Sequence, residues 1–321
     1  MLSSGPLRHH RSNASQTRHQ GFALLAVIAT AVLMVTVLAT LSKHSLKRAL
    51  AASDAAVRFQ QRWGMSSIES TLLPHARKIF EQSEKVTTEN PDAFAPRQIR
   101  SIITLGGVTF DVALADEDAK ANINTIYQAA GPQRANMIVT ELLGPPSNLA
   151  MRLAPNPAAA TFPIEPTDVE NEDDSAIEIE RAFRSWGEVF DESALTVVTG
   201  QQAALPQITQ EITIFGGGAI NLKRASDRAI TAIASCVLSR AGANRLVSRY
   251  RQNPTMSAEQ LIQQEAKSTT EKTRLRKMIA ESSQHFSLWI DASAPPRGRM
   301  RSLAITRQAD DGITVNERFA Y

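Results

Sequence analysis

The sequence predicts an α+β protein in which a long amino-terminal helix packs on an antiparallel sheet that carries a large helical insertion. The first observation is an uncharged apolar run from Gly21 to Leu41, followed by a helical pattern that contains no proline before Pro74. The second is a set of strand-like patterns near residues 99–114 and again after residue 284. Because helical patterns fill the sequence between these strands, we expect one sheet interrupted by an insertion.

The apolar run is long enough to cross a membrane. As a helix it covers about 30 Å, which is the thickness of one bilayer core. The apolar part of a removable signal peptide is shorter, about 7–15 residues, and ends at a small-residue cleavage site. One A-x-A pattern lies inside the run at residues 29–31, and the next, at 49–51, lies beyond three basic residues. Both positions are unsuitable for that cleavage, so residues 22–42 are interpreted as a retained transmembrane helix.

The charges around this run predict which side of the membrane each end faces. Arg8, Arg11 and Arg18 precede the run, and no acidic residue occurs before Asp54. Basic flanking segments stay in the cytoplasm, so we expect the amino terminus there and the main domain on the other side. Three basic residues between positions 43 and 48 weaken this bias without reversing it.

Composition argues against a nucleic-acid-binding surface. The chain has 35 basic and 32 acidic residues, and residues 1–21 contain three of the arginines, which leaves 32 of each sign in the rest. A nucleic-acid-binding domain would concentrate basic residues on its folded part. Cys236 is the only cysteine, so the chain forms no intramolecular disulfide. Its apolar helical surroundings predict a buried small side chain rather than a nucleophile.

Beyond the membrane, residues 43–85 are expected to continue the helix. Leu46, Leu50, Val57 and Ile68 recur at helical spacing and form a stripe suited to packing on a domain. Gly64 is a candidate weak point in this segment, because glycine is a poor helix former.

Two separated segments, 86–118 and 284–321, are expected to build the sheet. The first contains a hairpin in which a Gly-Gly turn at 106–107 joins two strands. The second contains strand patterns joined by proline- and glycine-containing turns. Residues 119–283 are therefore predicted to form an inserted helical domain.

Helix starts inside the insertion are marked by capping residues. Ser257 and Gln260 match a capping box at the start of one helix. Two segments, KANINTI at 120–126 and GAINLKRAS at 218–226, each place an asparagine just before a helical pattern. Asparagine side chains satisfy free N–H groups at helix starts, so both are expected to act as caps, with coincidental repetition as the alternative.

The sequence contains no recognisable catalytic motif. The histidines beyond the first 21 residues, His44, His75 and His285, are far apart, so each is expected to be a surface or packing residue. The FGGGA stretch at 215–219 lacks the lysine and hydroxyl residues of a phosphate-binding loop and predicts a turn with positive φ. No G-x-S-x-G nucleophile motif is present. We therefore expect no enzymatic activity and no organic cofactor.

An acidic stretch at residues 165–180 leaves two interpretations open. It contains eight carboxylates, and clustered oxygen ligands on a loop suit calcium. It lacks the glycine and ligand register of an EF-hand, so a solvated acidic loop is the favoured alternative. The calcium candidates are Asp168, Glu170, Glu172, Asp173 and Asp174.

The stretch that begins Gly21-Phe22 and continues ALLAVIATAVLMVTVLATL resembles the amino terminus of type IV prepilins. This resemblance implies that prepilin peptidase cuts after Gly21, removes the cytoplasmic leader 1–21 and methylates the new amino terminus at Phe22. Most such proteins have glutamate at the fifth mature position, where this chain has Ala26. Gln20 also departs from the basic residue that is usual before the glycine.

The rest of the chain resembles the minor pseudopilin K family of type II secretion systems. The similar stretches are VALADEDAKANINT, SALTVVTGQQAALPQITQEITIFGGGAINLKRAS and the closing FSLWIDAS. In the second stretch, Asn221-Leu222-Lys223 stands where the family more often repeats asparagine. The resemblance implies a pilin-like sheet, an inner-membrane anchor, a periplasmic main domain and a non-catalytic place at the pseudopilus tip. Family members lack the glutamate, and some bind calcium.

The implied role is pseudopilus assembly and protein secretion across the outer membrane. The implied partners are minor pseudopilins of the I and J types, the major pseudopilin, prepilin peptidase and the inner-membrane secretion platform. One alternative is a minor pilin of a related type IV pilus or DNA-uptake machine. The other is a single-pass membrane protein whose outer domain binds a small molecule or catalyses a reaction, and this protein would keep its leader.

Overall fold

The computed structural model of the protein describes residues 16–88, 95–145, 147–156, 181–199, 205–295, 298–309 and 312–320. The chain divides into two units, residues 1–59 and residues 60–321. The described part of the first unit is a stretch of one long helix. The described strands all belong to the second unit. The predicted acidic loop at 165–180 lies outside the described residues.

Helix α1 runs from Gln16 to Leu72 and contains the whole predicted transmembrane segment. Its apolar part includes three threonines, whose hydroxyl groups lack water partners in a bilayer. The hydroxyls of Thr30, Thr36 and Thr40 each donate to the carbonyl three residues earlier, at 2.8–2.9 Å. This bonding satisfies the polar groups within the helix, so the segment is compatible with apolar surroundings.

A short 3-10 turn, η1 (Leu73–His75), joins α1 to helix α2 (Ala76–Thr88). Pro74 lies in the first turn of η1, where its missing N–H breaks no helical hydrogen bond. Gln308 of the sheet holds this turn, because its Nε2 donates to the Leu73 carbonyl at 2.7 Å and its Oε1 accepts from the Arg77 N–H at 3.1 Å. The helical continuation predicted over residues 43–85 is therefore interrupted by a 3-10 turn at Leu73–His75.

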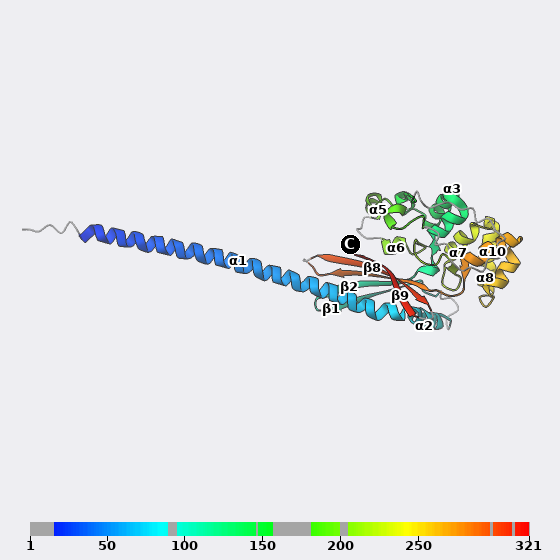
Figure 1. The fold of residues 1–321 in the computed structure, drawn as a ribbon, viewed down its shortest axis with the longest axis horizontal. Helices are drawn as coiled ribbons and strands as arrows, with labels where there is room; N and C mark the ends of the chain where they lie inside the picture. The colour runs from blue at the N-terminus through cyan, green and yellow to red at the C-terminus, as the bar shows by residue number, and fades with distance from the viewer. Residues whose placement is uncertain are drawn as a thin grey trace, which may run out of the picture. The chain divides into compact units, whose positions relative to one another are not determined.

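Five antiparallel strands form the sheet in the order β1-β2-β7-β8-β9 (Figure 1). They are β1 (Gln98–Leu105), β2 (Val108–Asp116), β7 (His285–Ser293), β8 (Arg299–Ala309) and β9 (Gly312–Ala320). The predicted hairpin is confirmed, since β1 pairs with β2 around Gly106 and Gly107, which both have positive φ. Strand β2 also pairs with β7, so the chain leaves the sheet at the end of β2 and re-enters it as the neighbouring strand β7.

One face of the sheet packs against the end of α1 and against α2. The rings of Phe80 and Phe286 stack with centroids 5.7 Å apart. The ring of Phe110 lies directly over Gly64, and Gln61 Nε2 donates to the Ala292 carbonyl at 3.3 Å. Helix α1 is unbroken at Gly64, so the predicted weak point is wrong. Glycine is needed there because the helix and the sheet approach each other too closely for a side chain.

The insertion between β2 and β7 is mostly helical. After the 3-10 turn η2 (Glu117–Ala119), its helical elements are α3 (Ile123–Leu143), η3 (Ser147–Ala150), α4 (Trp186–Val189), α5 (Glu192–Thr199), α6 (Leu205–Ile208), α7 (Asp227–Ser235), α8 (Arg240–Gln252), α9 (Ala258–Glu265) and α10 (Thr269–Met278). Two small parallel pairs complete it: β3 (Ala121–Asn122) with β4 (Ile212–Thr213), and β5 (Ile220–Asn221) with β6 (Ile279–Ala280).

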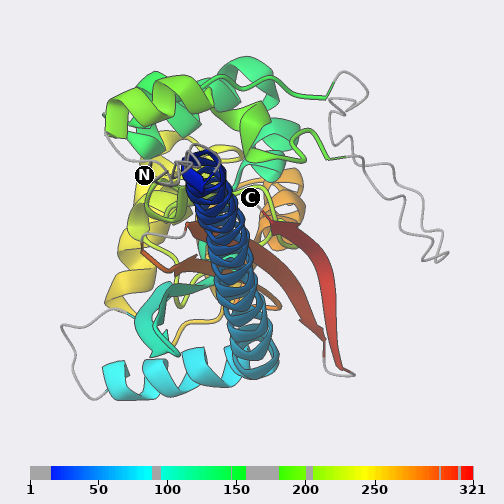
Figure 2. The same ribbon diagram turned by 90° about the vertical axis from the view of Figure 1, so that its left-hand side faces the viewer.

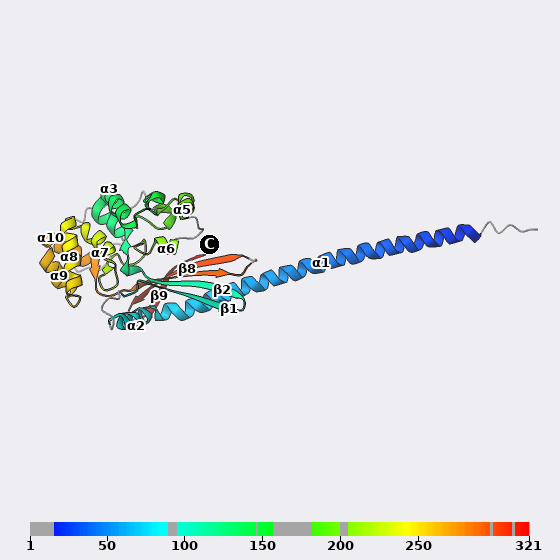
Figure 3. The same cartoon turned by 180° about the vertical axis from the view of Figure 1, so that it is seen from behind.

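The insertion packs against part of the other face of the sheet, opposite the end of α1 and α2 (Figures 2 and 3). Ala113, Trp289 and Leu303 lie side by side across neighbouring strands on that face. They belong to the same buried apolar cluster as Phe183 and Leu246 of the insertion. The α+β fold with a helical insertion is thus confirmed, and the insertion shares its core with the sheet.

Most of the predicted caps and turns are confirmed. Asn122 caps α3 by accepting from two backbone N–H groups, and Ser257 with Gln260 forms the predicted capping box. Gly216 and Gly218 have positive φ, as expected of the glycine-rich turn. The helix cap predicted at Asn221 is wrong in detail: this side chain caps a turn through the Lys223 N–H, whereas Ser226 caps α7.

Replacing Gly64 by alanine is expected to lower the free energy of unfolding by about 1–3 kcal/mol, the usual cost of overpacking. A Cβ at this position lies 2.3 Å from Cζ of Phe110, so the helix or the ring must move. The matched control is Gly187→Ala in α4, where the nearest neighbour of a new Cβ is 3.9 Å away. Chemical denaturation of both variants checks the difference. Equal small effects would show that the α1–sheet contact tolerates an added methyl group.

Candidate functional site

The apolar part of α1, residues 22–41, is the candidate site for membrane insertion and helix association. Every residue in it is exposed in the structure, and Phe22 keeps 76% of its surface accessible. The segment is long and apolar enough to span a bilayer. An exposed helix that is apolar all round is suited to lipid or to other apolar helices.

The residues of the predicted cleavage site lie in the same helix. Gly21 and Phe22 both fall within α1, and Ala26 follows one turn later. The Ala26 carbonyl accepts the Thr30 hydroxyl at 3.0 Å. Position 26 therefore adds no charge to an apolar surface on which a carboxylate would cost about 2.5–3.5 kcal/mol to insert. Cleavage after Gly21 and methylation of Phe22 stay predictions.

A second polar centre lies at the end of β2, where the chain leaves the sheet. Asp116 is fully buried, and its carboxylate accepts from Arg224 Nη1 at 2.8 Å and from Ser283 Oγ at 2.6 Å. It also accepts from the backbone N–H groups of Asp118 and Ala119, at 3.1 and 3.2 Å. Burial raises the pKa of Asp116 to about 6, and the neighbouring Asp118 charge raises it too, although Arg224 and Ser283 act in the opposite direction.

The carboxylate of the next residue, Glu117, is likewise paired and hydrogen-bonded. Its carboxylate forms a buried ion pair with Lys120 Nζ at 2.7 Å and accepts the Thr213 hydroxyl at 2.5 Å. The Ser287 hydroxyl of β7 donates to it as well. Buried charges are tolerated only when they are paired and hydrogen-bonded, and Glu117 meets both conditions.

Asp118 joins the insertion to the start of β7. Its carboxylate accepts from the backbone N–H of Gln284 at 2.7 Å and of His285 at 3.0 Å. The His285 ring lies beside it, with Nδ1 3.1 Å from the carboxylate. The packing role expected for His285 is therefore confirmed. The donors occupy these oxygens, so Asp118 acts as a structural tie.

Two asparagines extend this polar centre into the insertion. Asn122 Nδ2 donates to the Phe215 carbonyl at 2.6 Å. Asn124 bonds both ways with Phe183 and donates to the Ile214 carbonyl at 2.9 Å. The segment from Asp116 to Asn124 is therefore a buried polar anchor between sheet and insertion. Sequence reasoning identified its asparagine cap but missed the acidic residues, whose signal was three consecutive carboxylates directly after a buried strand.

The other residues considered for chemistry are Cys236 and the acidic calcium candidates. Cys236 is buried as expected, and burial raises its thiol pKa to about 12, which disfavours the reactive thiolate. In the part of the chain that the structure describes, no three histidine, cysteine or acidic side chains gather into a metal site. The calcium candidates lie outside the described residues, so calcium binding stays a prediction for Asp168, Glu170, Glu172, Asp173 and Asp174.

Comparison with known proteins finds similarity at the level of structure. No family model and no curated protein sequence matches the chain. A solved chain from the GspK-GspI-GspJ complex of the enterotoxigenic Escherichia coli type 2 secretion system is similar at 16% identity and a TM-score of 0.39. The similarity covers 83% of this chain and 99% of the solved one.

Proposed function

We propose that this chain is a K-type minor pseudopilin that takes part in pseudopilus assembly and in protein secretion across the outer membrane. The observation that carries the proposal is the continuity of α1. This one helix begins before the Gly21-Phe22 junction, presents an exposed apolar surface over residues 22–41, and ends packed on the antiparallel sheet. A retained membrane helix that becomes the stem of a filament subunit requires this arrangement.

The apolar helix supplies both the anchor and the first assembly surface. It lies in the inner membrane with its amino terminus in the cytoplasm and its main domain in the periplasm. Ala23, Ala29 and Ala39 are small residues along its length, and small residues let helices approach closely in lipid. The expected neighbours are the corresponding helices of I- and J-type minor pseudopilins and of the major pseudopilin.

Two features support a position at the tip. Ala26 replaces the carboxylate that, in the prepilin class, pairs with the amino terminus of a neighbouring subunit. A subunit that lacks this group makes no such pair. The insertion also packs against one face of the sheet, which adds bulk that a repeating filament subunit would have to accommodate. Both features suit a subunit that begins the fibre rather than one that repeats along it.

The proposed role is non-catalytic. The buried acids at the end of β2 are bound to basic side chains, hydroxyls and backbone N–H groups, as a structural network requires. The inner-membrane platform and prepilin peptidase complete the set of proposed partners. The peptidase acts on the leader and methylates Phe22.

The amino-terminal mass of the protein recovered from membranes tests this proposal. Cells with active prepilin peptidase are expected to yield a chain that begins at methylated Phe22, and cells without it a chain that keeps residues 1–21. Gly21→Val is expected to abolish processing, because a bulky residue replaces the glycine at the cut. Gln20→Lys, which restores the usual basic residue, is the matched control and is expected to be processed at least as well.

A leader that is retained regardless of the peptidase would contradict every pilin-like role and favour an ordinary membrane anchor. If processing occurs, the phenotype of a deletion strain identifies the machine. Loss of secretion with normal pili supports the type II system. Loss of pili or of DNA uptake with normal secretion would instead support the minor-pilin alternative.

A further inference from the structure

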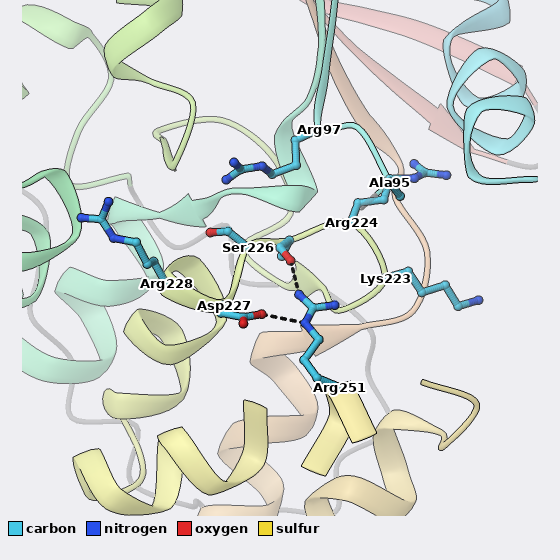
Figure 4. A pocket seen from close by; sticks show the side chains of 9 residues that line it. Ala95, Arg97, Lys223, Arg224, Ser226, Asp227, Arg228 and Arg251 are labelled. Carbon is cyan, nitrogen blue, oxygen red and sulfur yellow. Dashed lines mark hydrogen bonds and ion pairs between the residues drawn. The ribbon is translucent and has the colours of Figure 1, made fainter. Parts of the chain in front are cut away.

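A basic cavity of about 330 Å³ lies in the second unit, where the start of β1, the loop before α7 and the end of α8 come together (Figure 4). Its lining includes five basic side chains, Arg97, Lys223, Arg224, Arg228 and Arg251. The cavity has the size of a small-ligand site rather than of a protein-binding groove. It shares Arg224 with the buried network around Asp116.

Three of the five cations are already matched by carboxylates. Arg224 pairs with Glu84 and Asp116. The Arg97 guanidinium lies 2.5 Å from the Glu211 carboxylate. Arg251 bonds Asp227 at 2.6 Å, and Figure 4 shows this pair across the lower part of the cavity. These arginines therefore form walls that are held in place by their own ion pairs.

The other two cations have no carboxylate partner among the described residues. Arg228 donates to the backbone carbonyls of Glu141 and Leu142 at the end of α3, and these are neutral acceptors. The Lys223 side chain is exposed and forms no hydrogen bond or ion pair with the described part of the chain. The five cations face four paired carboxylates, Glu84, Asp116, Glu211 and Asp227, so the cavity keeps an excess of positive charge, which favours an anion.

We propose that this cavity binds a small oxyanion of the phosphate class. Arginine presents several N–H donors in a planar fork that matches phosphate oxygens, and lysine adds a mobile point charge. Arg228, at the start of α7, is the positioned donor, because its contacts with the carbonyls at the end of α3 fix its guanidinium. Free inorganic phosphate and a phosphorylated lipid headgroup share this chemistry. The proposal is independent of the assembly role proposed above.

The experiment is a calorimetric titration of the full, detergent-solubilised chain with inorganic phosphate at low ionic strength, where charge interactions are least screened. The unmodified protein is expected to bind. Arg228→Gln is expected to weaken binding by about tenfold or more, as loss of a charge-assisted hydrogen bond does, and Lys223→Gln by less because it is exposed. Glycerol phosphate is titrated in the same way. If it binds more tightly than inorganic phosphate, a phosphorylated lipid headgroup is favoured over free phosphate as the ligand.

The control removes the same charge elsewhere on the insertion, with Lys267→Gln and Lys277→Gln on exposed positions. Both are expected to bind phosphate as the unmodified protein does. If Arg228→Gln destabilises the end of α3, Lys223→Gln still tests the proposal, because the Lys223 side chain makes no hydrogen bond or ion pair with the described residues. Failure of the unmodified protein to bind phosphate, or equal weakening by the control substitutions, would overturn the proposal.

Discussion

Replacing Arg224 by methionine is expected to lower the free energy of unfolding by about 3–5 kcal/mol, the cost of breaking a buried ion pair by removing one partner. The Arg224 side chain is only 5% exposed, and Asp116, its 2.8 Å partner, is completely buried. Arg224 also pairs with Glu84 and lies over the Phe80 ring, 5.3 Å from its centroid. Methionine fills part of the space but leaves the Asp116 charge unpaired inside the protein.

The matched control is Arg240→Met. Arg240 also pairs with a glutamate, Glu141, but the two side chains are 71% and 61% exposed. Exposed ion pairs contribute about 0–1 kcal/mol, so the control is expected to change stability little. Urea denaturation followed by tryptophan fluorescence measures both variants, since Trp186 and Trp289 are buried in the insertion and the sheet, respectively. If both variants lose less than about 1 kcal/mol, the Asp116–Arg224 pair does not stabilise the fold as argued.

The importance of this pair also shows what the sequence could and could not predict. Local periodicity and turn residues predicted helix α1, the β1–β2 hairpin and the carboxyl-terminal strands. The glycines at 106 and 107 mark their turn without reference to the rest of the chain. Such elements need no knowledge of distant partners.

The buried network required that knowledge. Asp116 bonds residues 224 and 283, and Glu117 bonds residues 213 and 287, all far along the chain. Three consecutive acids after a strand are also compatible with a solvated turn, so the local pattern alone does not indicate burial. The same limit explains Asn221, whose cap was predicted for α7 although its side chain serves a nearer turn. In the cavity, Arg97 and Arg251 lie far along the chain from the cations at 223–228, and sequence spacing does not bring them together.

Gly64 shows a related limit. Helix propensity predicted a weak point, because glycine is intrinsically unfavourable in a helix. The structure reverses that interpretation, since Phe110 occupies the space that a side chain at position 64 would need. Here a tertiary contact requires glycine at position 64, and the local cost in helix propensity is the smaller effect.

The second large effect is expected in the pH dependence of stability. Burial raises the pKa of Asp116 from 3.8 to about 6. Between these pH values, Asp116 is therefore protonated in a larger fraction of folded than of unfolded chains. Stability from Asp116 is therefore fully present below pH 3.8 and is lost as the pH rises through 6. The shift of about two units corresponds to roughly 3 kcal/mol.

Comparison with Asp116→Asn isolates this contribution, because asparagine is neutral at every pH while the other groups titrate as before. The altered hydrogen bonds of asparagine add an offset that does not change with pH. We expect the free energy of unfolding of the unmodified protein to fall by about 2–2.5 kcal/mol relative to the variant between pH 4 and pH 7. A difference that stays constant with pH would contradict the raised pKa of Asp116. Because Arg224 lowers this pKa, Arg224→Met is expected to extend the fall to higher pH and to cost less at pH 4 than at pH 7.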